Sequence, residues 1–584
     1  MPVQYTFFGR PIALRMPPRR FQLVFGILVL FTIGLLFGTS APSRVPYIQD
    51  FQVFKPGSHK APQQENSSNG DTAWYSHWGW RNPFSSSVTF DENRAVLPPL
   101  KTRPPIYTFY DPILKSSQQV RDAEQELLLI WRRAWWAQGF QPVVLGRAEA
   151  MNNPMYESLQ HLDLEPTMEH ELARWLAWEH MGTGICANWL ALPMAPYDDS
   201  LMTFLRRGEF PLLTRIEGLG NGIFYGEKQS ISVALKQAVN SGSLSTAKTM
   251  IDALGIKAFN VDPTGGKSVS FYSSDNISKL YSTISAELES EDPATGFVHL
   301  ASLITSHLQQ TWQSVHTQGI GILSPYIGQR TFPVLLAPAI SLARNLSACP
   351  HTPLPASCPP NRQKCSPCSQ SKTPKLFLPS SAPNKTDIFT IGTVPHPYTI
   401  TSLVTRLSNF NARWIRRTGL KNRDLWIRSA TNSLYDKSVG GAGRTVGFKD
   451  LVASDTGYAH SIWLTAERET HKDLDWIFGF EIMRNLTEAD LPPPPEFEVA
   501  ETHDALVEED ELLQKARKAI KSPVLPAKGV TNAVEAWNLA DTEAWRFTRA
   551  WSARRRMERL KWEEEEKKYA GAESKARGGD RWFG

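Results

Sequence analysis

The sequence IYTFYDP at residues 106–112 is a short run of β-branched and aromatic residues that ends in Asp111-Pro112, a pattern typical of a strand and a turn. Apolar residues then recur at helical spacing from Val120 to Ala134, and Gly139 predicts where that helix ends. The run PVVL at 142–145 predicts a second strand. A strand, a helix and a strand in this order predict a parallel pair joined by a crossover helix.

The same alternation continues along the chain. Helices are expected at 165–180, 230–239, 245–254 and 296–315, and strands at 268–273 and 387–394. Strands that alternate with helices are typical of a mostly parallel α/β sheet, which is the predicted fold class.

The charge and hydropathy of the N-terminal sequence predict the cellular compartment of the protein. Residues 21–43 carry no charge, and the core of this run, from Leu23 to Phe37, is almost wholly apolar. The uncharged run as a whole is long enough for the roughly 20 residues that cross a bilayer. Four basic residues and no acid precede it: Arg10, Arg15, Arg19 and Arg20. The positive-inside rule then predicts a type II signal anchor at 21–40 with a lumenal body, in the Golgi or ER membrane or the plasma membrane. The alternative is a signal peptide cleaved near 38–41.

Two further features agree with a lumenal body. Five Asn-X-Ser/Thr sequons are candidate glycosylation sites: Asn66, Asn276, Asn345, Asn384 and Asn485. Four of the five cysteines lie in one Pro- and Ser-rich loop: Cys349, Cys358, Cys365 and Cys368. An oxidising lumen favours two disulfides of open connectivity, and a four-thiolate zinc site is the alternative. Cys186 is expected to be a small buried hydrophobe.

Composition limits the function classes. Of the 584 residues, 41% are hydrophobic and 21% charged, which excludes a wholly disordered chain or a multi-span membrane protein. The net charge of +5 is too weak for a dedicated nucleic-acid binder. We expect a cytoplasmic tail (1–20), the anchor (21–40), a Pro/Ser-rich stem (41–103), an α/β domain (104–485), a Pro/acidic linker (486–530) and a charged helical tail (531–584).

The tail repeats Trp537, Ala544 and Trp551 every seven residues. A helix with such a stripe either packs this edge on the body of the same chain or pairs with the same helix of a second copy to form a homodimer.

Several polar residues are candidates for chemistry. Asp111 ends the first strand, where ligands of open α/β sheets bind, and Arg206 and Arg215 are candidates for pairing with a diphosphate. Asp424 and Asp475 stand beside tryptophans, and either is a candidate general base for an acceptor hydroxyl. His396, between two prolines, is a candidate acid/base or a loop anchor.

The helix with Arg174-Trp175-Leu176-Ala177, a Gly-rich break, and an apolar run that ends in Leu192-Pro193 resembles the donor-site segment of Golgi glycosyltransferases with a DXD motif. The resemblance covers roughly Pro104 to Gly226 and implies a GT-A, Rossmann-like lumenal domain. It also implies a nucleotide-sugar donor and a glycan acceptor. In that family two carboxylates hold Mn²⁺ or Mg²⁺ against the leaving diphosphate.

This sequence departs from the motif at its carboxylates. Asn188 stands at the first of the two positions and Leu190 at the second, so only a neutral amide oxygen remains for the donor site. Asp198 and Asp199 follow a few residues later and are the candidate replacement metal ligands.

The whole chain also resembles a group of filamentous-fungal single-anchor proteins, through segments 135–140, 358–362 and 392–398. That resemblance implies no activity. We therefore expect a single-anchor secretory-pathway protein that transfers a sugar from a nucleotide donor to a glycan or glycoprotein. A catalytically inactive scaffold of the same ancestry and a wall-polysaccharide-binding protein are the alternatives.

Overall fold

The structure is a computed structural model. It describes residues 6–7, 10–11, 58–61, 97–112, 116–325, 332–362, 365, 368–369, 372–406, 424–454, 457–467, 473–496, 502–537 and 539–569. The chain forms two units, Met1–Lys55 and Pro56–Gly584. In the first, β1 (Thr6–Phe7) pairs antiparallel with β2 (Arg10–Pro11).

The predicted anchor at 21–40 and the Asn66 sequon lie outside the described residues. Within the described ranges, none of the helices has the length and apolar character that a bilayer crossing requires. The anchor stays a prediction.

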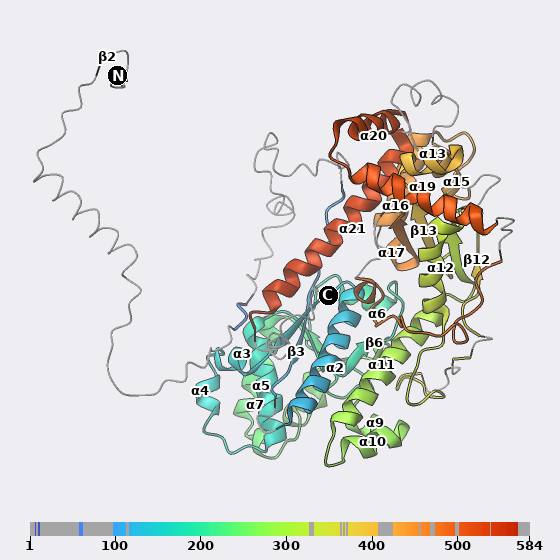
Figure 1. The fold of residues 1–584 in the computed structure, drawn as a ribbon. Coiled ribbons are helices and arrows are strands. Elements are labelled where there is room, and N and C mark those ends of the chain that lie inside the picture. Colours follow the sequence, from blue (N-terminus) through green and yellow to red (C-terminus); the bar gives the residue numbers. More distant parts are fainter. Residues whose placement is uncertain are drawn as a thin grey trace, which may run out of the picture. The chain divides into compact units, whose positions relative to one another are not determined.

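The first sheet of the second unit has six strands in the order β4-β3-β5-β8-β7-β9 (Figure 1). They are β3 (Pro105–Phe109), β4 (Gln141–Leu145), β5 (Gly184–Ala187), β7 (Thr214–Ile216), β8 (Ile223–Gly226) and β9 (Asn260–Asp262). β3 pairs in parallel with β4 and β5, which confirms the predicted crossover unit. β8 runs antiparallel to both of its neighbours, so this sheet is mixed.

The second sheet is entirely parallel, in the order β12-β11-β13-β14. Its strands are β11 (Gly319–Leu323), β12 (Leu376–Phe377), β13 (Ile388–Val394) and β14 (Ser461–Thr465). β6 (Ala191–Pro193) and β10 (Val269–Phe271) form a separate antiparallel pair. The predicted α/β class is confirmed, with its strands divided between these sheets.

Helices cover the sheets. They are α2 (Gln118–Ala137), α3 (Arg147–Met151), α4 (Tyr156–Leu159), α5 (Pro166–Met181), α6 (Ser200–Leu205), α7 (Lys228–Asn240), α8 (Met250–Leu254), α9 (Ser274–Leu280), α10 (Ser282–Leu288), α11 (Ala294–Val315), α12 (Pro333–Ser347), α13 (Pro397–Thr405), α15 (Leu425–Ala430), α16 (Gly441–Ala453), α17 (Gly457–His460), α18 (Leu474–Phe478), α19 (His503–Lys521), α20 (Leu525–Trp537) and α21 (Leu539–Glu566). α2 and α11 lie side by side in the middle of this unit (Figure 1).

The ends of α2 follow from its sequence. The hydroxyl of Ser117 accepts a hydrogen bond from the Val120 amide at 3.2 Å and caps the N-terminus. Gly139 follows the C-terminus with φ of +88°, as predicted. A Cβ at Gly139 would lie 3.0 Å from Arg206 Cδ, so a glycine is also needed to let that side chain approach.

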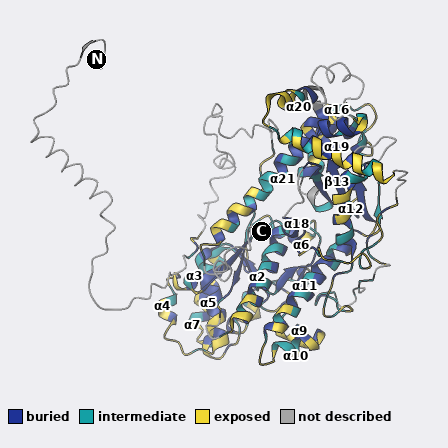
Figure 2. Cartoon of the chain, in the orientation of Figure 1, coloured by how far each residue is buried: buried dark blue, intermediate teal, exposed yellow. Residues whose placement is uncertain are grey.

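The core is rich in tryptophan. Trp131 and Trp135 on α2 and Trp175 and Trp178 on α5 are completely buried. The indole of Trp135 donates to the Ala191 carbonyl at 3.0 Å and so fixes α2 to β6. Figure 2 shows β13 buried along its length, while α19 presents exposed residues on its outer face.

The C-terminal helix α21 packs on the body. Ala544 and Trp551, two of the three residues of the heptad stripe, are buried with Trp463 of β14. Trp562 stacks on Trp136 with ring centroids 4.9 Å apart. These two residues of the stripe are therefore covered by the protein's own chain, and the homodimer stays a prediction.

We expect Gly392→Ala to destabilise the parallel sheet. A Cβ at Gly392 would lie 2.2 Å from the buried indole of Trp463, and neither strand β13 nor β14 can move away. Overpacking of this kind costs about 1–3 kcal/mol. Thermal unfolding measures the loss against Gly440→Ala, since a Cβ at Gly440 meets nothing within 4 Å. Equal melting temperatures in the two variants would contradict this packing.

Candidate functional site

A small, partly open pocket lies where the helices of the first sheet meet the strands of the second. It is bounded by the end of α2, the segment after β6, helix α11, the start of β13, and α18 with the residues that follow it. Its volume of about 90 Å³ holds about six waters at roughly 15 Å³ each. This is room for one sugar ring and not for a nucleotide as well.

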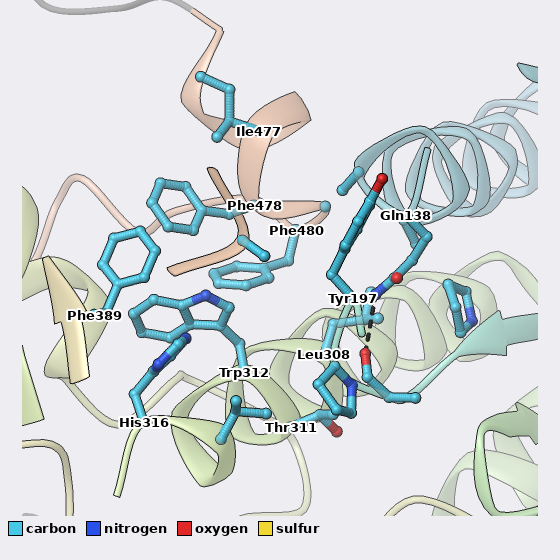
Figure 3. Close-up of a pocket in the computed structure, with 18 of the residues that line it drawn as sticks. Gln138, Tyr197, Leu308, Thr311, Trp312, His316, Phe389, Ile477, Phe478 and Phe480 are labelled. Carbon is cyan, nitrogen blue, oxygen red and sulfur yellow. Dashed lines mark hydrogen bonds between the residues drawn. The ribbon is translucent and has the colours of Figure 1, made fainter. Parts of the chain in front are cut away.

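Aromatic rings form one wall of the pocket (Figure 3). Trp312 is at its centre, with ring centroids 5.0 Å from Phe389, 5.5 Å from Phe478 and 6.4 Å from Phe480. Tyr197 stands on the opposite side (Figure 3). Flat apolar surfaces of this kind suit the C–H faces of a sugar ring.

Polar atoms without partners face the same space. The side-chain oxygen of Gln138 and Nδ1 of His316 are buried and make no hydrogen bond within the described part of the chain. Burial, and to a lesser degree the neighbouring His460, lower the pKa of His316 to about 3, so this imidazole is neutral at physiological pH. Buried polar atoms normally have partners, so these are available to ligand hydroxyls.

His460 and Asp198 form a pair at the edge of the pocket. His460 ends α17, and its ring centroid lies 6.0 Å from that of His316. Both of its ring nitrogens are buried without a hydrogen bond to any described residue, and Nε2 lies 3.9 Å from the half-exposed carboxylate of Asp198. That separation is too long for a direct hydrogen bond and leaves an electrostatic attraction between the two groups when the imidazole is protonated.

A larger cleft of about 850 Å³ lies along the polar side of α11, and Thr311 lines both spaces. Arg362 and Lys372 bring positive charge to it, and none of its described lining residues is acidic. Arg362 is held in place by a 2.7 Å hydrogen bond from its guanidinium to the Met194 carbonyl. A phosphate fits such a lining.

The cysteine-rich loop forms the outer wall of this cleft. Its disulfides join Cys349 to Cys368 and Cys358 to Cys365, each with Cα atoms 5.7 Å apart. The predicted disulfides are thus confirmed over zinc, and the open connectivity is resolved. Cys186 is buried and free, as expected.

The positions of the missing DXD carboxylates are used for a turn. The side-chain oxygen of Asn188 accepts from the Leu190 amide at 2.9 Å, and the Asn188 amide donates to the Gly222 carbonyl at 2.7 Å. This turn separates β5 from β6, which the sequence suggested as one apolar run.

The candidate metal ligands have other partners in the structure. One oxygen of Asp199 accepts from the amides of Leu201 and Met202 and caps α6, so Asp199 acts as a helix cap. Asp198 pairs with His460. Among the described residues no group of three or more His, Cys, Asp or Glu side chains is placed to hold an ion.

The predicted donor residues are spread out. Asp111 accepts from Arg147 at 2.8 Å at the edge of the first sheet, away from the pocket. Arg206 lies over the Tyr197 ring at 3.7 Å and donates to the Gln138 carbonyl, so it supports two residues of the pocket wall. Arg215 belongs to β7 and lines neither cavity.

The predicted catalytic residues have structural partners. Asp424 accepts from the Ala540 amide at 3.1 Å, and Asp475 accepts from Arg484 at 3.0 Å. His396 is buried at the N-terminus of α13 and accepts from the Tyr398 amide at 3.0 Å, in agreement with the loop-anchor interpretation. None of the three lines the pocket. His316 and His460, which the sequence analysis did not single out, do line it.

A family model described as "Domain of unknown function (DUF8765)" matches residues 68–584. No curated protein and no solved structure matches the chain.

Proposed function

The chain belongs to the DUF8765 family, a domain of unknown function, and from its pocket chemistry we propose that it is a glycosyltransferase-like protein of the secretory pathway. It would be anchored by residues 21–40 and transfer a sugar from a nucleotide donor to a glycan. The observation that carries this proposal is an aromatic pocket lined by imidazole nitrogens that make no hydrogen bond to any described residue, with the Asp198 carboxylate 3.9 Å from one of them.

His460 is the proposed general base. The acceptor sugar lies against the Trp312 wall, with one hydroxyl between Nε2 of His460 and the Asp198 carboxylate. As the hydroxyl oxygen bonds to the anomeric carbon of the donor, its proton passes to His460, and the bond from that carbon to the diphosphate breaks. Asp198 stabilises the imidazolium that forms.

The leaving diphosphate is proposed to lie in the cleft beside α11. Arg362 and Lys372 supply there the positive charge that a metal supplies in the family with the DXD motif. Because Asp199 caps α6 and Asp198 pairs with His460, no step of the proposed reaction is assigned to an ion. Two disulfides agree with an oxidising lumen and support the proposed compartment.

We expect His460→Asn to abolish transfer. Asparagine keeps the approximate shape and cannot accept the proton at neutral pH, so the rate should fall by about 10²–10⁴-fold. The measurement is release of UDP or GDP from a panel of sugar nucleotides, incubated with the full chain and mixed glycan acceptors. His351→Asn, at an exposed histidine, is the matched control. A normal rate in the His460 variant would end its assignment as the base.

The second candidate is sugar binding without transfer. It is favoured by the replacement of both DXD positions with Asn188 and Leu190 and by the use of Asp199 as a cap. In that case Trp312→Leu would lose retention on immobilised glycans, while the wild-type chain would release no nucleotide. Nucleotide release by the wild-type chain that is lost in the His460→Asn variant would exclude sugar binding without transfer.

A further inference from the structure

A third cavity, a cleft of about 390 Å³, opens beside a glycosylation sequon. It is bounded by residues 382–386, by the first residues of β13 and β14, and by α16. Its volume falls within the roughly 300–1,000 Å³ of ligand-binding cavities. Asn384, the first residue of the sequon Asn384-Lys385-Thr386, is one of its lining residues.

The described sequons differ in how accessible their amides are. Asn276 is half-buried in α9, and its side-chain amide donates to the Phe271 carbonyl at 2.8 Å. Asn345 is half-buried in the last turn of α12. Asn384 and Asn485 are both exposed and outside helices and strands, but Asn485 does not line this cleft. The two exposed sequons therefore differ in whether a cavity stands beside them.

The lining of the cleft suits a sugar. Tyr435 and Trp463 present aromatic surface, and Leu434 and Leu451 add apolar side chains. Asp450 is an exposed carboxylate that can accept hydrogen bonds from sugar hydroxyls. Apolar faces beside a few polar groups are the usual composition of a carbohydrate site.

We propose that this cleft holds the first sugars of the chain's own N-linked glycan at Asn384. Nδ2 of Asn384 attacks the anomeric carbon of an oligosaccharyl lipid diphosphate. The nitrogen–carbon bond forms, the carbon–oxygen bond to the diphosphate breaks, and the amide proton leaves with the diphosphate. This rests on the lumenal location in the proposed function. His460, the proposed general base, also lines this cleft, but the argument uses no catalytic step.

Because the glycan is covalently attached to the same chain, its binding to the cleft is an intramolecular event. The bond at Asn384 keeps the first sugars beside the cleft that Tyr435 and Trp463 also line, so their effective concentration there is high and weak contacts are enough to hold them. The bound sugars cover the loop at 382–386 and stabilise the edge of the parallel sheet.

The test compares Asn384→Gln with Asn485→Gln in the full chain made in a glycosylating host. Peptide mass spectrometry first establishes whether each site carries a glycan. We expect both sites to be occupied, and Asn384→Gln to lower the melting temperature by about 2–4 °C, while Asn485→Gln leaves it unchanged. When the same two variants and the wild type are made without glycosylation, their melting temperatures should be equal, because replacing the Asn side chain with Gln does not itself change the stability.

Three results would overturn the proposal. If Asn384 carries a glycan and the two variants melt alike, the glycan does not occupy the cleft. If Asn485 is modified and Asn384 is not, the cleft holds no glycan although the body is lumenal. If neither is modified, the lumenal location in the proposed function fails with it, whereas nucleotide release still tests the catalysis separately.

Discussion

Asp541→Asn should make the protein more stable at pH 8 and leave it unchanged near pH 4. Asp541 at the start of α21 is 3% exposed, and one of its oxygens accepts from the Ile427 amide at 3.0 Å. Burial raises the pKa of this carboxyl from 3.8 to about 7. The Ile427 amide opposes this rise, and the negative charge of Asp424 adds to it. The ionised form is therefore the costly one in the folded state.

The direction of the pH effect follows from that shift. The folded state holds its proton up to about pH 7 and the unfolded state releases it near 3.8, so the stabilisation is complete below pH 3.8. It declines as the pH rises and is lost once the pH passes about 7. The difference of 3.2 pKa units corresponds to about 4 kcal/mol. Asparagine keeps an oxygen for the Ile427 amide and carries no charge.

Thermal unfolding between pH 4 and 8 is the measurement. The wild-type melting temperature should fall across this range more steeply than that of the variant, and the variant should melt several degrees higher at pH 8. Asp510→Asn, at an exposed aspartate of α19, is the control and should follow the wild type. Parallel curves for the wild type and Asp541→Asn would mean that Asp541 is ionised without cost.

Removing the disulfide between Cys349 and Cys368 should destabilise the protein and open the cleft beside α11. This bond closes a loop with a sequence separation of 19, for which chain entropy predicts about 3 kcal/mol. The bond from Cys358 to Cys365 closes a shorter loop, with a sequence separation of 7, so its removal should lower the free energy of unfolding by about 2.5 kcal/mol. Cys365 and Cys368 both line the cleft, so either loss should also weaken donor binding.

Double Cys→Ala variants of each pair test this prediction. Unfolding in denaturant gives the two stability losses, and non-reducing peptide mapping of the wild type gives the connectivity. Donor binding by the paired variants is compared at a temperature where both are folded. Peptides joined in another pairing, or donor binding that survives the loss of both bonds, would contradict the role given to this loop.

The long, periodic elements of the fold could be predicted from sequence. The segment from Ile106 to Leu145 carries alternating apolar patterns and a terminal glycine, and its strand–helix–strand unit is present. β7, β8 and β9 were missed because they have three or four residues, too few for a periodic pattern. Pairing with distant strands, and not local propensity, makes them strands.

The site was harder to predict, because an Asp or His before a helix looks the same in sequence whether it caps the helix or reacts. Asp199 and His396 are both helix caps. His460 has no motif around it. It becomes a candidate only when the end of α17 places it beside Asp198, which is 262 residues earlier in the chain. A pair formed by segments so far apart leaves no local pattern in the sequence.

The central claim is that the body binds a nucleotide sugar without a metal. The most direct test is the melting temperature of the full chain in detergent against a panel of UDP- and GDP-sugars, with manganese and with a chelator. Selective binding to the folded state raises the melting temperature. The account predicts a rise with one donor class that is the same in both conditions. No rise with any donor, or a rise that needs manganese, would contradict it.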